Sequence, residues 1–147
     1  MKSSGHRCIL LFRFLLFLSF ASCLYSGEIR ILLSGASELG SIRAKDLKSL
    51  FLMQVDRVDG IRLEVIEHPF DSSLRQDFAR DYLNMNHQQM KDYWLKRFIT
   101  YGQLEPRVKK NCRAALRYLI LNPQSIAYCE EPVELPEGVR ILEVRHH

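Results

Sequence analysis

The polar residues best suited to chemistry lie close together, where an expected strand gives way to an expected helix. The strand ends near residue 67, and the residues that follow include His68, Ser72, Ser73 and Arg75. Backbone amides at a helix start carry partial positive charge, and hydroxyl groups beside them can bind an oxyanion. Arg75 can add a charge-assisted hydrogen bond, and His68 changes its charge near neutral pH. The spacing therefore predicts a weak site for phosphate or another small oxyanion.

Two further residues bear on this site. Ser34 ends an earlier expected strand, and we include it among the anion-binding residues. Asp71 and Ser72 stand where side-chain oxygens can satisfy the free amides of the helix start. Because Asp71 is itself an anion, plain helix capping is the alternative to anion binding at this position.

The sequence contains no recognisable catalytic constellation. It has no Gly-rich phosphate loop, no Gly-x-Ser-x-Gly turn and no nucleophile that can be paired with a base. The adjacent Glu130 and Glu131 would point to opposite faces of a strand, which argues against a carboxylate dyad. We therefore expect a binding protein and not an enzyme, with no cofactor and no metal ion.

The cysteines leave two interpretations open. Cys8 and Cys23 fall in or beside an N-terminal leader, so Cys112 and Cys129 remain for the folded domain. Two thiols in an exported chain can form a disulfide, or they can be two small buried apolar side chains. A cysteine pair without clustered histidines is a poor metal site.

Residues 1–23 have the layout of a secretory signal peptide. Lys2 and Arg7 precede an apolar run, and small residues follow it. The apolar run after Arg13 is shorter than the ~20 residues that cross a bilayer, although an uncleaved anchor is the alternative. We expect a signal peptide at 1–23, one domain at 24–147 and a periplasmic or otherwise exported protein. Cys23 also fits a lipoprotein signal, in which it would carry a lipid anchor.

The charge distribution argues against nucleic-acid binding. The chain has 21 Lys and Arg against 17 Asp and Glu, a net charge of +4. Three of the basic residues lie in the first 23 residues, which leaves 18 basic against 17 acidic residues in the rest of the chain. A nucleic-acid surface needs a basic patch, which a nearly neutral domain with mixed signs does not favour.

Hydrophobic periodicity predicts helices that separate apolar strands. This order favours an α/β fold with a mostly parallel sheet flanked by helices. Met90, Trp94 and Phe98 share one face of an expected helix that Asn86 can cap, and we expect Trp94 in the core. The expected elements are strand 28–33, helix 43–53, strand 61–67, helix 71–83, helix 86–98, helix 106–121 and strands 125–129 and 139–144.

Several motifs between residues 41 and 129 occur together in one known family. They are Ala-Lys-Asp-Leu-Lys-Ser-Leu-Phe-Leu at 44–52, the Asp-Gly turn and strand at 59–66, Leu-Arg-Gln-Asp-Phe at 74–78, Tyr-Trp at 93–94, Phe-Ile-Thr-Tyr-Gly at 98–102, and Asn-Pro-Gln-Ser-Ile-Ala-Tyr at 122–128. Because these motifs follow one another in the family's order, the chain resembles the short, single-lobe relatives of periplasmic phosphate-binding proteins. Those proteins are the solute-binding components of ABC importers.

The resemblance implies one lobe of a type II periplasmic-binding-protein-like fold and a non-catalytic binding role. The family's phosphate-binding segment is Arg-Ser-Asp-Gly-Ser-Gly-Thr, and only Ser72 is retained here in kind. His68 stands for the Arg, Phe70 for the Asp, Ser73 for a Gly and Leu74 for the Thr. One lobe alone also leaves one face of an anion in water, which weakens charge-assisted bonds.

The changed segment leaves a second function open. The chain can be an envelope protein-interaction or accessory module that kept the fold without a ligand. An exposed apolar surface on a single lobe would also allow homo-oligomers.

Overall fold

The computed structural model describes residues 27–131 and 133–146. The signal peptide predicted at 1–23, with Cys23, lies outside the described residues. Among the residues that the structure describes, every helix is too short or too polar to span a membrane.

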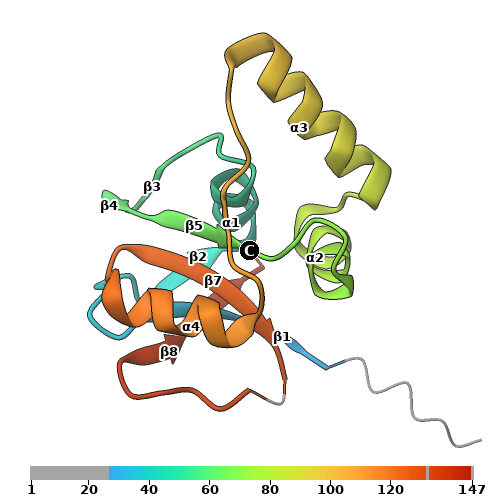
Figure 1. The fold of residues 1–147 in the computed structure, drawn as a ribbon. Coiled ribbons are helices and arrows are strands. Elements are labelled where there is room, and N and C mark those ends of the chain that lie inside the picture. Colours follow the sequence, from blue (N-terminus) through green and yellow to red (C-terminus); the bar gives the residue numbers. More distant parts are fainter. Residues whose placement is uncertain (1–26, 132, 147) are drawn as a thin grey trace, which may run out of the picture.

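The centre of the fold is a five-stranded mixed sheet (Figure 1). Its middle strand β7 pairs in parallel with β5, which pairs in parallel with β6. On the other side β1 runs antiparallel to both β7 and β8. Four of the five strands therefore run in one direction, and β1 alone runs in the other. In sheet order, the strands are β6 (Arg107–Val108), β5 (Glu64–Glu67), β7 (Ser125–Glu130), β1 (Ile29–Ser34) and β8 (Val139–Ile141).

Two small strand pairs flank this sheet. In one, β2 (Ser41–Arg43) pairs in parallel with β9 (Glu143–Arg145). In the other, β3 (Arg57–Val58) and β4 (Ile61–Arg62) form a short antiparallel hairpin. The hairpin turn contains Asp59 and Gly60, both with positive φ, which suits an Asp-Gly sequence.

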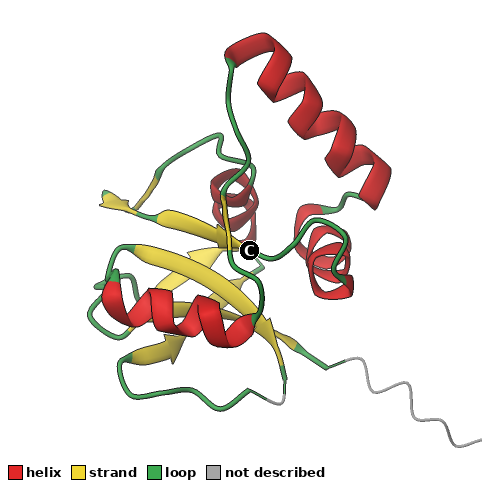
Figure 2. Cartoon of the chain, viewed as in Figure 1, coloured by secondary structure: helices red, strands yellow, loops and turns green. Residues whose placement is uncertain are grey.

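Helices cover both faces of the sheet (Figure 2). They are α1 (Ala44–Phe51), α2 (Ser73–Phe78), which continues as the π-helical turn η1 (Ala79–Leu83), α3 (His87–Tyr101) and α4 (Cys112–Leu121). One face packs against α1, α2 and η1, and the other against α4. The predicted α/β architecture is confirmed.

Alternating side chains of the central strands explain these layers. In β1, Ile31 and Leu33 point into the core under α1 and α2, whereas Leu32 points to the side of α4. In β7, Tyr128 lies in the first core and Ala127 in the second. Because both faces are covered, these strands are continuous apolar runs.

Helix α3 is attached through one face and stands away from the sheet (Figure 1). It begins at His87, and Asn86 caps it as expected; Asn86 also forms a capping box with Gln89. Met90 and Trp94 are buried, so the core position expected for Trp94 is confirmed. Phe98 is 54% exposed, so its expected place on the same buried stripe is wrong.

Several element boundaries differ from the sequence prediction. The single strand expected at 61–67 is divided at Leu63 into β4 and β5, which belong to different sheets. The helix expected from residue 106 begins at Cys112, because Asn111 caps it by accepting a hydrogen bond from the amide of Ala114. Before it, Arg107 and Val108 form the edge strand β6. The last expected strand is divided at Leu142, which is buried and donates its amide hydrogen to Ile31.

Candidate functional site

Four of the five predicted anion-binding residues lie in one segment, where β5 ends and α2 begins. The Arg75 side chain donates to the backbone carbonyl of His68 at 3.2 Å. The amide of Arg75 donates to Oγ of Ser72 at 3.3 Å. Ser73 is the first residue of α2 and is exposed.

Ser34 lies at the opposite end of the sheet. It is the last residue of β1, which runs antiparallel to β7, whereas β5 runs parallel to β7. The carboxyl ends of β1 and β5 therefore lie at opposite ends of the sheet. The Ser34 Oγ accepts a hydrogen bond from the amide of Ala36 at 3.3 Å and supports the local turn. The structure therefore does not place Ser34 in the cluster of His68, Ser72 and Arg75.

Ser72 acts as the cap of α2. Besides accepting from Arg75, its hydroxyl donates to the carbonyl of Pro69 at 2.7 Å. Both hydrogen bonds serve the local chain, which is the capping alternative considered for this position. Helix α2 has six residues before the π-helical turn. The Ser73 side chain remains open to solvent.

Arg75 is buried and faces carboxylates of the same chain. Its side chain is 3% exposed, with Nη2 2.7 Å from Glu105 and Nε 3.4 Å from Glu67. The guanidinium also lies 4.9 Å from the ring centre of Phe70. Two carboxylates therefore already compensate the positive charge that an external anion would need.

Glu67 is a member of this site that the sequence analysis did not select. Its carboxylate is 1% exposed and accepts hydrogen bonds from the Tyr128 hydroxyl at 2.6 Å and from the His68 amide at 3.3 Å. Burial raises the pKa of Glu67, against the opposing effects of Arg75 and the Tyr128 hydrogen bond. The alternation of residues 61–67 placed Glu67 at a strand end but did not reveal its burial.

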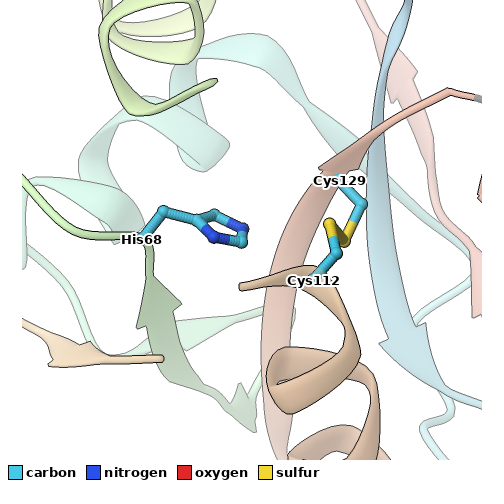
Figure 3. A group of neighbouring side chains, drawn as sticks. All are labelled: His68, Cys112 and Cys129. Atoms are coloured by element: carbon cyan, nitrogen blue, oxygen red, sulfur yellow. A yellow bond between two sulfur atoms is a disulfide. The ribbon is translucent and has the colours of Figure 1, made fainter. Parts of the chain in front are cut away.

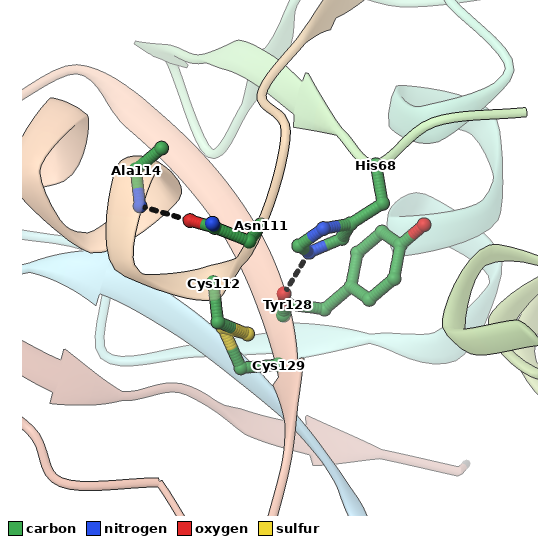
Figure 4. Close-up of a disulfide and its surroundings, with 6 residues drawn as sticks. All are labelled: His68, Asn111, Cys112, Ala114, Tyr128 and Cys129. Carbon is green, nitrogen blue, oxygen red and sulfur yellow. Dashed lines mark hydrogen bonds between the residues drawn. A yellow bond between two sulfur atoms is a disulfide. The ribbon is translucent and has the colours of Figure 1, made fainter. Parts of the chain in front are cut away.

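Tyr128 connects Glu67 with His68. Burial and the neighbouring Glu67 carboxylate raise the pKa of Tyr128, so it acts as a hydroxyl donor. The Nε2 atom of His68 lies 2.8 Å from the carbonyl of Tyr128 (Figure 4). Because a carbonyl only accepts, Nε2 carries the hydrogen. Burial lowers the pKa of His68, which favours the neutral ring.

A disulfide lies beside this network. Cys112 and Cys129 are bonded, with their Cα atoms 5.7 Å apart, and they join the start of α4 to β7 (Figure 4). A ring nitrogen of His68 and the two sulfur atoms all lie within 4.8 Å of one another (Figure 3). The sequence analysis considered the cysteines alone, because His68 is distant in sequence.

A separate pocket of about 950 Å³ opens at the other end of β5. It lies between the β4–β5 segment, residues 105–107 and the end of α4, and its wall includes Arg62, Glu64 and Arg107. Glu64 accepts hydrogen bonds from Arg107 and from Tyr118, each at 2.7 Å. The pocket contains none of the residues selected from the sequence.

No protein-family model and no curated protein matches the chain. Solved structures do match its fold. An ABC-type phosphate transport receptor of Vibrio cholerae is 12% identical, with a TM-score of 0.57. The match covers 81% of this chain and 46% of the receptor's chain. PstS of Borrelia burgdorferi is 17% identical, with a TM-score of 0.60. The match covers 80% of this chain and 47% of the PstS chain.

A third match is a Clostridium perfringens structure described as a phosphate ABC transporter substrate-binding protein with bound phosphate. It is 10% identical, with a TM-score of 0.60. The match covers 81% of this chain and 45% of the Clostridium chain. The chain thus spans about half the length of the structures it matches. The fold implied by the sequence resemblance is confirmed.

Proposed function

We propose that the chain is an exported, non-catalytic binding protein built like one lobe of a phosphate transporter's substrate-binding component. In this proposal it binds phosphate or another small oxyanion weakly, beside the exposed Ser73 and the Ser72 cap. The observation that carries the proposal is the fold shared with proteins described as phosphate receptors.

The chemistry of the cluster supports weak binding and not tight binding. Arg75 donates to Glu105, packs against Glu67 and is 3% exposed. A phosphate that used this guanidinium would have to displace a carboxylate already held at 2.7 Å. The Ser72 hydroxyl is likewise engaged by the chain itself. Only Ser73 is free of such a role among these three residues.

Calorimetric titration of the folded protein with phosphate, and separately with sulfate, tests this proposal. We expect dissociation constants no tighter than about 1 mM. The Ser72→Ala, Ser73→Ala double variant is expected to lose the rise in Tm that phosphate produces in the unchanged protein. Each variant is compared with its own Tm without phosphate, because removing a cap lowers stability by itself. Ser49→Ala on α1 is the matched control and should keep the response.

Micromolar phosphate affinity would contradict weak binding and indicate a dedicated phosphate carrier. Binding that survives in the double variant would contradict the assignment to Ser72 and Ser73 while leaving weak anion binding in place.

A second candidate is an envelope protein-interaction module without a small ligand, acting alone or as a homo-oligomer. The exposed apolar side chains along α3 favour this candidate: Leu95 and Phe98 are each 54% exposed and Ile99 is 73% exposed. Contiguous exposed apolar side chains are typical of interaction surfaces. In this case, partner binding is expected to be unchanged in the Ser72→Ala, Ser73→Ala variant and lost in Phe98→Glu, Ile99→Glu.

The place of the protein in the cell belongs to the same proposal. Export follows from the leader predicted at 1–23, and a lipid anchor on Cys23 would hold the domain at a membrane surface. Metabolic labelling with a fatty acid distinguishes the anchored form, because Cys23→Ser is expected to abolish the label if the anchor exists.

A further inference from the structure

Three side chains from separate parts of the chain meet as a potential ligand set. His68 directly follows β5, Cys112 is the first residue of α4, and Cys129 lies in β7. The imidazole nitrogen and the two sulfur atoms all lie within 4.8 Å of one another (Figure 3). His68 is 2% exposed and Cys129 is fully buried, whereas Cys112 is partly exposed.

Redox state decides whether these atoms can bind a metal ion. In the disulfide form the two sulfurs are bonded to each other and provide no thiolate. A dithiol reductant supplies two electrons and two protons, which breaks the sulfur–sulfur bond and converts the reductant to its own disulfide. The product is two thiols, which lose their protons when they bind a metal ion.

We propose that reduction of the Cys112–Cys129 disulfide creates a zinc site formed by both thiolates and the imidazole of His68. This inference goes beyond the proposed oxyanion binding and does not depend on it. Two cysteines and one histidine with a water molecule as fourth ligand form a recognised zinc coordination set.

The geometry needs only small movements. Zinc–sulfur bonds of about 2.3 Å and zinc–nitrogen bonds of about 2.0 Å in a tetrahedron place the ligand atoms roughly 3.3–3.8 Å apart. The three atoms already lie within 4.8 Å of one another. Once the disulfide is broken, rotation about each Cα–Cβ bond lets the sulfurs separate to this spacing.

The hydrogen bond of His68 holds its ring against the strand that carries one of the sulfurs. Nε2 donates to the carbonyl of Tyr128, the residue before Cys129, at 2.8 Å (Figure 4). A zinc ion bound through Nε2 replaces this single hydrogen bond with a coordinate bond. Two thiolate–zinc bonds accompany that exchange and outweigh the hydrogen bond that is lost.

The charges of the site also balance. Two thiolates cancel the charge of Zn²⁺, so the occupied site has no net charge where burial would penalise one. Cys112 stands at the amino-terminal end of the ten-residue helix α4, and this position favours a thiolate. Its partial exposure leaves a route for the ion and for the water ligand.

Cobalt titration tests the proposal directly. The purified protein is reduced with an excess of phosphine under argon, and Co²⁺ is added as the spectroscopic probe. We expect a thiolate-to-cobalt charge-transfer band in the near ultraviolet and tetrahedral d–d bands, both saturating at one equivalent and both lost when Zn²⁺ is added. The unreduced protein should show neither set of bands.

Variants assign the ligands. Cys112→Ser and Cys129→Ser should each abolish the charge-transfer band at one equivalent, and His68→Gln should weaken Co²⁺ binding at least tenfold. His87→Gln is the matched control, because His87 lies outside the ligand set, and its titration should match that of the unchanged protein. Far-ultraviolet circular dichroism accompanies every titration to show that the reduced chains are folded.

Three results would overturn the proposal. One is a folded, reduced protein without the charge-transfer band at one equivalent of Co²⁺. Another is an unchanged titration in either cysteine variant. The third is a reduced chain that is unfolded in the presence of Zn²⁺, because the site requires β7 and α4 to stay together.

Discussion

The guanidinium of Arg75 lies against the carboxylate of Glu67 inside the protein, with Nε 3.4 Å from Oε2. The two side chains are only 3% and 1% exposed. Glu105 joins Arg75 from the surface, and the Tyr128 hydroxyl donates to the same Glu67 oxygen. Arg75, which the sequence analysis predicted to bind an external anion, is thus paired with carboxylates of its own chain.

Replacing Arg75 should strongly reduce the free energy of unfolding. Arg75→Met leaves the Glu67 carboxylate buried without its compensating charge, and we expect a loss of about 3–5 kcal/mol in the free energy of unfolding. Urea denaturation at neutral pH measures it. Arg80→Met is the matched control, since the Arg80 side chain is 62% exposed and pairs with Asp77 and Asp81 on the surface. A comparable loss in both variants would contradict the interior role of Arg75.

The two adjacent serines should differ in their effect on stability. Ser72→Ala removes the cap of α2 and is expected to lower the free energy of unfolding by about 1 kcal/mol. Ser73→Ala, at an exposed position, should change it by less than about 0.5 kcal/mol. Thermal unfolding of the two single variants without phosphate makes the comparison. Equal losses would show that the Ser72 hydrogen bonds do not stabilise the turn.

Two aromatic residues of α3 provide a second contrast. Trp94 is 4% exposed, and Trp94→Ala should cost about 3–5 kcal/mol because it leaves a cavity between α3 and the core. Phe98, one turn later, is 54% exposed, and Phe98→Ala should leave stability within about 1 kcal/mol. Denaturation curves of both variants test this, and a large loss in Phe98→Ala would show that α3 packs through a second face.

The disulfide should stabilise the oxidised domain. It closes a segment with a sequence separation of 17 residues, and the Cys112→Ala, Cys129→Ala double variant should lose about 3 kcal/mol. Adding a reductant should lower the Tm of the unchanged protein and leave that of the double variant unaltered. Zinc is kept out of these samples with a chelator, so that metal binding does not compensate. A Tm that is insensitive to reductant in the unchanged protein would contradict this prediction.

The stability of the protein at acidic pH should depend on Glu64. Desolvation raises its pKa, but hydrogen bonds from Arg107 and Tyr118 outweigh this effect, and the pKa of Glu64 is lowered from 4.5. A lowered folded-state pKa stabilises the fold above pH 4.5, and this contribution is lost as the pH falls through the lower folded-state value. Because the Glu64 side chain is 42% exposed and solvent screens its ion pair, the effect should stay below about 1 kcal/mol. Glu64→Gln should flatten the acid limb of the stability curve, and an unchanged limb would contradict the prediction.

The sequence predicted the fold well where apolar periodicity was strong. The strands at residues 29–34 and 125–130 were evident as short, largely apolar runs. The helices around Leu47 and Trp94 were evident because their buried side chains repeat at helix spacing. The start of α4 was misplaced because Pro106 suits a first helical turn. Pairing of Arg107 with Ile66 in the neighbouring strand favours the extended form instead.

The candidate site was less predictable than the fold. Local spacing brought Ser72 and Arg75 together, since they belong to the same helix start. The partner carboxylate of Glu105 lies 30 residues farther along the chain, and Tyr128 is 61 residues from Glu67. Such contacts depend on the tertiary arrangement, which periodicity does not encode. The same limit explains why His68 was not grouped with the cysteines.

The position of β1 has a consequence for the order of assembly. This strand lies early in the sequence, but both strands that pair with it, β7 and β8, lie near the carboxyl-terminal end of the chain. One edge of β1 therefore has no partner until β7 is made, and the other has none until residues up to Ile141 are made. A shortened chain that stops after α4 would leave an apolar strand with two open edges. The central sheet can therefore be completed only when nearly the whole chain is present, because both partners of β1 are contacts of long sequence separation.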